Sequence, residues 1–233
     1  MKEAILFTCV ILTLILLLVS CSETLPNTPE PTNKTVEESS KDAKISIYSP
    51  MTLSSNNMYP LNGNNQYLRL RMVAGKYSED WNPGAYMGTL WEGKYIIELA
   101  DESGNTITQT DLSKYFKEPL VFNSSFDIQF DDYNNDGDLD FTLGQYATSN
   151  GNDFKLFTLR KNGNVEELSI KDYPTLFISK KTGYYSTKLT KVSNITFSKQ
   201  YYDNSKQKNF EDIFKWDGKE FIHIKSQELK ENN

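Results

Sequence analysis

Apolar residues recur at every second position in several short segments of the chain. The alternation is strict in 126–130 and 139–143, and it is looser in 67–72 and 94–99. Successive side chains of a strand point to opposite faces of a sheet, so this pattern predicts strands with one buried face. Asn-Gly and Asp-Gly pairs are typical of tight turns with positive φ. Turn sequences separate the predicted strands: ESGN at 102–105, KNGN at 161–164 and WDGK at 216–219.

Helix signals are weak by comparison. Only two segments, 111–116 and 204–212, are compatible with short helices. Ala is scarce, whereas the chain has 14 Tyr and 13 Phe and is rich in Asn. Aromatic residues favour strands, Asn favours turns, and a shortage of Ala disfavours helix. The sequence therefore predicts a mainly β domain, an antiparallel strand meander that forms a β-sandwich or propeller-blade-like sheets.

The N-terminus has the pattern of an export signal. Residues 1–21 contain one Lys, then an uncharged run from Ala4 to Val19, and they end in Leu-Val-Ser-Cys. A run of this length is typical of a signal-peptide core and is short for a membrane span. An uncleaved anchor helix is the alternative. Either arrangement places the bulk of the chain outside the cytoplasm.

The Leu-Val-Ser-Cys sequence at 18–21 resembles the lipobox of bacterial lipoproteins. The resemblance implies cleavage before Cys21 and attachment of a diacylglyceryl group, with acyl chains such as palmitate. It also implies a cell-membrane protein that is lipid-anchored and faces the extracytoplasmic side. The only other Cys is Cys9, within the apolar run, so the mature chain would have no disulfide, Cys-based zinc site or cysteine nucleophile.

Composition divides the rest of the chain into a spacer, a domain and a tail. Residues 22–44 contain three Pro within six positions and almost no apolar residues. Such a segment cannot bury enough surface to fold, so we expect a flexible tether whose ends lie roughly 25–30 Å apart as a random coil. Residues 45–228 suffice for one β-rich domain, or for two small ones divided near residue 120. Residues 229–233 form a short tail.

The charge pattern restricts the possible partners. The net charge is −6 at pH 7, the pI is about 5.0, and Lys and Arg form no basic patch. Binding to nucleic acid depends on such a patch, and so does electrostatic binding to anionic lipid. The sequence therefore predicts that the protein does not bind nucleic acid and that the membrane is its anchor and not its ligand. The ligand would be an unknown extracellular protein or glycan.

One segment, DDYNNDGDLDF at 131–141, concentrates five carboxylates and two carboxamides in eleven positions. Oxygen-bearing side chains alternate along it, and Gly137 permits a sharp turn. Such a loop suits a hard cation such as Ca²⁺, whereas the lack of His and Cys argues against zinc. A metal-free acidic turn is the alternative, because Asp, Asn and Gly are common turn residues. The candidate metal ligands are Asp132, Asn134, Asp136, Asp138 and Asp140.

This loop and its flanking segments resemble an FG-GAP or VCBS repeat, in which a D-x-[DN]-x-D-G-x-x-D loop joins two blade strands and holds Ca²⁺. The matching stretches are DYNNDGDLDFTLGQY and FKLFTLRKNGNVEEL, within 120–228. FKWDGKEFIHI at 214–224 resembles the last hairpin of small extracytoplasmic lipoproteins. The resemblance implies that Asp138 binds through its backbone carbonyl and the other four residues through their side chains. One repeat is recognisable, so a complete propeller is not implied.

A second local concentration is aromatic. Residues 77–95, YSEDWNPGAYMGTLWEGKY, contain two Trp and three Tyr. Exposed aromatic rings on a β scaffold can stack on sugars, which makes Trp81 and Trp91 candidate glycan contacts. Packing of these rings in the core is the alternative.

Catalytic motifs are not recognisable. His223 is the only histidine, and the chain has no G-x-S-x-G elbow, G-x-x-x-x-G-K phosphate loop or H-E-x-x-H zinc motif. A pair of catalytic carboxylates would be invisible in the sequence, because their separation arises only on folding. The sequence therefore favours a non-catalytic binding or assembly module. A cell-wall glycan-binding module is the next hypothesis, and a carboxylate-dependent hydrolase the last.

Overall fold

The computed structural model describes residues 45–47 and 50–230. These residues belong to one compact unit, Ser40–Asn233. The predicted signal peptide, Cys21 and the spacer 22–44 lie outside the described residues, as do the last three residues of the tail. None of the described helices is long and apolar enough to cross a membrane.

Two long strands organise the first sheet. Strands β3 (Gln66–Asp80) and β4 (Gly88–Asp101) pair antiparallel from end to end. Each of the other four strands pairs with β3 or β4: β1 (Ile45–Ile47), β2 (Met51–Asn57), β5 (Thr106–Asp111) and β6 (Leu120–Phe122). The helical segments described are short: α2 (Tyr59–Asn62) and the 3-10 turn η1 (Leu112–Lys114).

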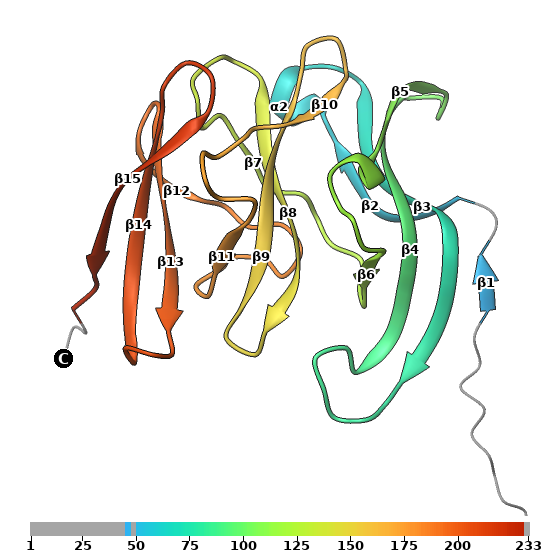
Figure 1. The fold of residues 1–233 in the computed structure, drawn as a ribbon. Helices are drawn as coiled ribbons and strands as arrows, with labels where there is room; N and C mark the ends of the chain where they lie inside the picture. The colour runs from blue at the N-terminus through green and yellow to red at the C-terminus, as the bar shows by residue number, and fades with distance from the viewer. Residues whose placement is uncertain (1–44, 48–49, 231–233) are drawn as a thin grey trace, which may run out of the picture. The chain divides into compact units, whose positions relative to one another are not determined.

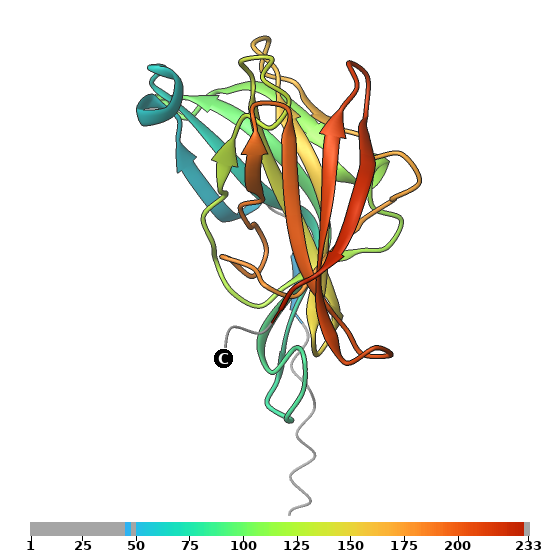
Figure 2. The ribbon, with the colours of Figure 1, turned by 90° about the vertical axis from the view of Figure 1, so that its left-hand side faces the viewer.

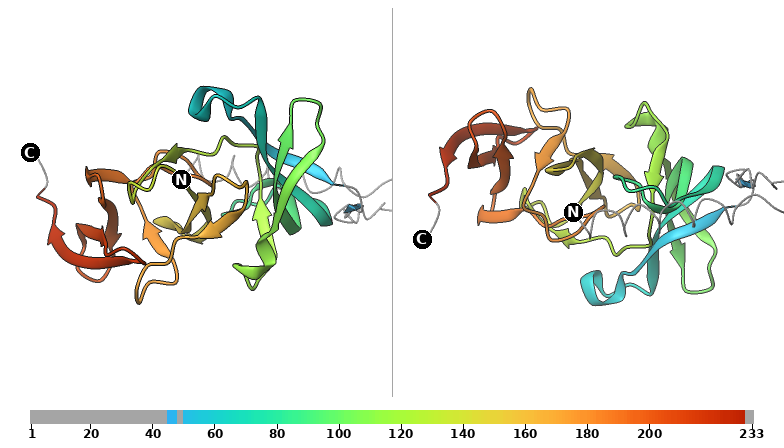
Figure 3. Two further views of the ribbon diagram at one scale, coloured as in Figure 1. Left: turned by 90° about the horizontal axis from the view of Figure 1, so that it is seen from above. Right: turned by 90° about the horizontal axis from the view of Figure 1, so that it is seen from below.

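The second and third sheets are also antiparallel. The second sheet contains β7 (Phe130–Asp131), β8 (Leu139–Thr148), β9 (Gly151–Leu159), β10 (Val165–Glu167) and β11 (Leu176–Ile178). The third contains β12 (Thr190–Ser193), β13 (Thr196–Asp203), β14 (Lys208–Trp216) and β15 (Phe221–Glu228). The sheets follow one another in chain order (Figure 1), and both views in Figure 3 show them side by side in an open row. The described residues therefore form a mainly β meander and no closed propeller.

Buried side chains join the sheets in two clusters. In the first cluster, Phe141 and Phe157 of the second sheet pack with residues of β3 and β4. In the other, Phe154 and Leu156 pack with residues of β13, β14 and β15. Neighbouring residues of β9 thus belong to different clusters, and the second sheet is covered on both faces. This arrangement explains why nearly every residue of 139–144 is buried.

The predicted turns are confirmed. ESGN, KNGN and WDGK lie at the ends of paired strands, and their glycines, Gly104, Gly163 and Gly218, have φ of 88°, 86° and 105°. The predicted short helix at 111–116 is present as η1, which begins where the Asp111 carboxylate accepts a hydrogen bond from Ser113 N–H.

Two predicted elements are wrong. The predicted helix at 204–212 is not formed: residues 204–207 make a turn and the rest belongs to strand β14, because Phe210, Phe214 and Trp216 lie on one face and the backbone pairs with β13 and β15. The predicted strand 126–130 is mostly irregular. Side chains replace the expected ladder there, since Asn56 accepts a hydrogen bond from Ile128 N–H at 2.8 Å.

Candidate metal site

The acidic segment forms a closed turn between two strands of the second sheet. It begins at Asp131 in β7 and ends at Asp140 in β8, and these two residues are paired in the antiparallel ladder. Asn135 has φ of 60° and Gly137 has φ of 80°, left-handed values that reverse the chain direction. The sheet therefore fixes both ends of the turn predicted at Gly137.

Two predicted ligands hold the turn through its own backbone. Asp132 accepts hydrogen bonds from the N–H groups of Asn135 (2.7 Å) and Gly137 (3.1 Å). Asp136 accepts one from the N–H of Asp138 at 2.9 Å. Such contacts stabilise an acidic turn without a metal, which is the alternative that the sequence leaves open.

Asp140 is the most deeply buried of the predicted ligands: its side chain is fully buried, and Asn134, the other buried one, is 4 % exposed. It lies opposite Thr158 of β9, on the face of the second sheet that packs against the third. Its Oδ2 accepts a hydrogen bond from Tyr133 N–H at 2.8 Å, whereas Oδ1 has no partner among the described residues. Burial raises the pKa of Asp140 from 3.8 to about 7; the Tyr133 N–H and the Thr158 hydroxyl oppose this rise, and the nearby Asp136 and Asp132 add to it. An unpartnered carboxylate oxygen in this environment favours a proton or a cation.

Arg160, which directly follows β9, is the residue that the sequence analysis missed. Its Nη1 donates to Asp136 (2.9 Å) and Asp138 (3.2 Å), and its Nε donates to Glu166 (3.0 Å). Burial acts to raise the pKa of Asp136, but hydrogen bonds from Asp138 N–H, the Asn134 amide and Arg160 outweigh it, so this pKa is lowered. Arg160 is distant in sequence and reaches the turn only because β8 and β9 pair.

The donor chemistry of the turn fits a hard cation, but the described residues do not form a complete coordination shell. Asp138 Oδ1 is buried without a partner, as is Asp140 Oδ1. Carboxylate oxygens are the ligands that Ca²⁺ prefers. Arg160, however, already offsets two of the carboxylates. Among the residues that the structure describes, no group of three or more His, Cys, Asp or Glu is arranged to hold a metal ion.

The two Trp residues predicted as glycan contacts have different environments. Trp81 lies between β3 and β4 at the end of their hairpin, and 67 % of it is exposed. Trp91 is partly buried: its ring centroid lies 5.8 Å from that of Tyr77, and it packs against the first core cluster. Only Trp81 presents a widely exposed indole.

His223 lies beside a buried ion pair of the third sheet. Lys199 Nζ is 2.9 Å from Asp212 Oδ2, and each of these side chains is 5 % exposed. Ser226 donates to Asp212 Oδ1 at 2.6 Å, and His223 Nε2 is 3.1 Å from Ser226 Oγ and 3.6 Å from the same Asp212 oxygen. A Ser-His-Asp triad requires opposite imidazole nitrogens to face Ser and Asp. Here one nitrogen faces both, so these residues lack triad geometry.

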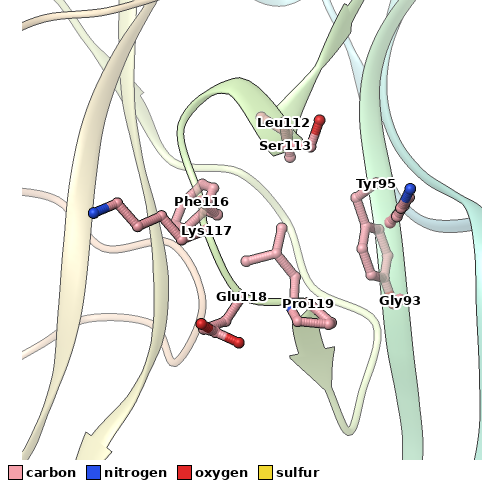
Figure 4. A pocket seen from close by; sticks show the side chains of 10 residues that line it. Gly93, Tyr95, Leu112, Ser113, Phe116, Lys117, Glu118 and Pro119 are labelled. Atoms are coloured by element: carbon pink, nitrogen blue, oxygen red, sulfur yellow. The ribbon is translucent and has the colours of Figure 1, made fainter.

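Several hollows in the surface are further candidate sites. The first lies between β4 and residues 112–120 and has a volume of about 100 Å³; Figure 4 shows Tyr95, Phe116 and Pro119 around it. The second, of about 360 Å³, lies beside the acidic turn. Two further open hollows, of about 380 Å³ beside Gln200 and about 350 Å³ beside Ser125, reach the size of a typical small-molecule site, roughly 300–1,000 Å³, and so does the hollow beside the acidic turn. Its polar lining includes Asn62, Asn64, Gln66, Arg160 and Lys161.

Comparison with protein-family models, with curated proteins and with solved structures finds no match to this chain.

Proposed function

We propose that this chain is a lipoprotein held in the cell membrane through Cys21, with its β domain on the extracytoplasmic side. The domain acts as a non-catalytic binding or assembly module for an extracellular protein or glycan. The turn at 132–140 carries one structural Ca²⁺. In this proposal the FG-GAP or VCBS resemblance applies to the turn and its flanking strands alone, since the described sheets form an open row.

The observation that carries the calcium proposal is the buried Asp140. Its unpartnered Oδ1 lies at the base of a turn that contains several further carboxylates. A divalent cation there would neutralise this carboxylate and replace the hydrogen bonds that it lacks. Asp132, Asn134, Asp136 and Asp140 would supply side-chain oxygens, and Asp138 its backbone carbonyl. Because Asp136 and Asp138 contact Arg160, cation binding would compete with these ion pairs.

A non-catalytic role agrees with the geometry of the other candidates. The residues around His223 lack triad geometry. The apolar hollow beside Tyr95 is below the usual size of a ligand site. The larger hollow beside the acidic turn, of about 360 Å³, has a polar lining that includes Arg160 and Lys161, and a β domain of this kind would use such surface features to recognise a partner.

Thermal unfolding of residues 40–233 with EDTA, with Ca²⁺ and with Mg²⁺ tests the calcium proposal. For a site with Kd of about 10⁻⁴–10⁻³ M, about 10 mM Ca²⁺ should stabilise the fold by about 1.4–2.7 kcal/mol. In a domain of this size this gain raises Tm by roughly 3–11 °C. Mg²⁺ should do less, because it dehydrates reluctantly and demands octahedral geometry.

Two variants make the result specific to the turn. Asp136→Ala should abolish the Ca²⁺-dependent rise in Tm. Asp217→Ala is the matched control: Asp217 also caps a turn, through the N–H groups of Lys219 and Glu220, but between β14 and β15. It should lower Tm equally with and without Ca²⁺. Equal Tm values in EDTA and Ca²⁺ for the unmodified protein would make the segment a metal-free turn.

A further inference from the structure

The hairpin between β3 and β4 projects beyond the rest of the first sheet. The two strands pair as far as Asp80 and Gly88. Of their neighbours, β2 stops opposite Met72 and β5 opposite Ile96, while β1 reaches Tyr77 and β6 reaches Trp91. Figures 1 and 2 show the hairpin extending away from the body of the sheet. Residues 81–87, which we call the hairpin tip, join the two strands.

The hairpin tip exposes apolar side chains that the fold does not use. Trp81 is 67 % exposed and Met87 is 52 % exposed. The indole N–H of Trp81 donates to Glu79 at 3.1 Å, so the polar atom of the ring already has a partner. The exposed remainder of Trp81 is hydrocarbon surface, and removing this surface from water is favourable.

The tip is attached to the second sheet. Tyr86 is partly buried, and its ring lies 5.4 Å from the ring of Tyr146 in an edge-to-face arrangement. This contact restricts how far the tip can swing. Trp81 and Met87 are therefore presented by a supported hairpin and lose less conformational freedom when they bind.

The direction of β1 places the start of the domain at the same end. Ile45 is paired with Tyr77 and Ile47 with Gly75, so β1 runs away from the hairpin tip. The chain therefore enters the described domain from the side of Trp81. Ile45 is itself 59 % exposed. A tether that is anchored in lipid would pull this end of the domain, and no other, toward the membrane.

We infer that the hairpin tip inserts Trp81 and Met87 into the headgroup region of the bilayer that carries the anchor. This inference rests on the proposed lipid anchor at Cys21. Trp favours the membrane–water interface, where its ring is partly in hydrocarbon and its N–H stays near polar groups. A weak contact suffices, because a short tether holds the tip at an effective concentration on the order of millimolar near the surface.

The charges of the tip indicate which lipids it contacts. The charged residues of 78–88 are Glu79 and Asp80, both acidic. Anionic lipid would repel them, so the contact depends on burial of apolar surface and is not electrostatic. We expect it to be at least as strong on phosphatidylcholine as on mixtures with phosphatidylglycerol, and to persist at about 0.5 M NaCl.

Fluorescence quenching by brominated lipid tests this inference on the full lipidated chain in phosphatidylcholine vesicles. The chain has three Trp, and Trp81→Phe should remove most of the lipid-dependent quenching. Trp216→Phe is the matched control, because Trp216 lies at the β14 end that turns into β15; this variant should keep the quenching. Bromine near the headgroup end of the acyl chain should quench more than bromine near the terminal methyl group.

Flotation of the same vesicles separates this inference from the proposed anchor. If the chain floats with the vesicles, Cys21→Ser abolishes this flotation and the quenching depends on Trp81, the results support both the anchor and the membrane inference. Flotation without such quenching overturns the inference and leaves the anchor intact. A chain that does not float refutes the anchor, and the inference with it. If cell-wall polysaccharide retains the chain through Trp81 while brominated lipid does not quench it, the tip is a glycan contact and the membrane inference is wrong.

Discussion

Replacement of Asp140 by Asn removes one buried negative charge and leaves the shape of the side chain unchanged. The Asn side-chain oxygen can still accept the hydrogen bond from Tyr133 N–H. Its amide can donate to the hydroxyl of the cross-strand Thr158, which faces the carboxyl group of Asp140 in the fold. Without a bound cation, the variant should therefore be more stable than the unmodified protein at alkaline pH.

The size of the effect follows from the pKa of the buried carboxyl group. The pKa of Asp140 is about 7 in the folded protein, against an ordinary value of 3.8. The folded state therefore binds the proton more tightly than the unfolded state, and stability falls as pH rises from about 4 to about 7. At about 1.36 kcal/mol for each tenfold difference in proton affinity, the ionised carboxylate costs about 4 kcal/mol. This corresponds to roughly 8–16 °C in Tm for a domain of this size.

Thermal unfolding followed by circular dichroism measures the difference. In EDTA, Asp140→Asn should have a higher Tm than the unmodified protein at about pH 8, and this gap should shrink toward about pH 5, where the carboxyl group is protonated in the fold. At about pH 8, about 10 mM Ca²⁺ should stabilise the unmodified protein by about 1.4–2.7 kcal/mol and the variant by much less.

Either of two results would refute this reasoning. An equal gap in Tm at both pH values would mean that Asp140 does not titrate between them. A lower Tm for the variant in EDTA at about pH 8 would mean that the carboxylate stabilises the fold through its charge, with no need for a proton or a cation. Asp217→Asn, in an exposed turn, should show no change in its effect across this range.

Two further predictions concern packing and the buried ion pair. Gly144→Ala should lower the free energy of unfolding by about 1–3 kcal/mol, because a Cβ at this position would clash with the ring of Phe154. Chemical denaturation measures this free energy, and an unchanged midpoint would contradict the expected clash. Lys199→Met should lower the free energy of unfolding by about 3–5 kcal/mol, because it leaves Asp212 buried without its cation. Asp212→Asn in the same chain should restore part of this loss. Additive losses in the double-mutant cycle would mean that the two side chains do not stabilise each other.

The sequence determined the elements whose conformation depends on near neighbours. The alternation at 139–143 predicted a strand that forms the start of β8, and the turn at Gly163 adopts the positive φ that its Asn-Gly pair requires. These features are local, because side-chain alternation and backbone sterics act within a few residues. They sufficed to predict a mainly β antiparallel meander.

Elements that depend on distant partners could not be predicted in this way. Residues 126–129 alternate like a strand, yet Asn56 and Ser186 accept the hydrogen bonds of Ile128 and Gln129 N–H, and the ladder is not formed. The predicted helix 204–212 is replaced by a turn and the start of β14, because β13 and β15 supply backbone partners on both sides of that strand. In both cases contacts across the fold outweighed local preference.

The acidic turn divides in the same way. The sequence determined which side chains carry oxygen, their spacing and the reversal at Gly137. Only the tertiary structure decided their environments: Asp140 is buried because the second sheet is covered on both faces, and Arg160 reaches Asp136 because β9 pairs with β8. Burial and charge pairing arise between segments far apart in the chain, and these two effects control whether a carboxylate holds a proton, an arginine or a metal ion.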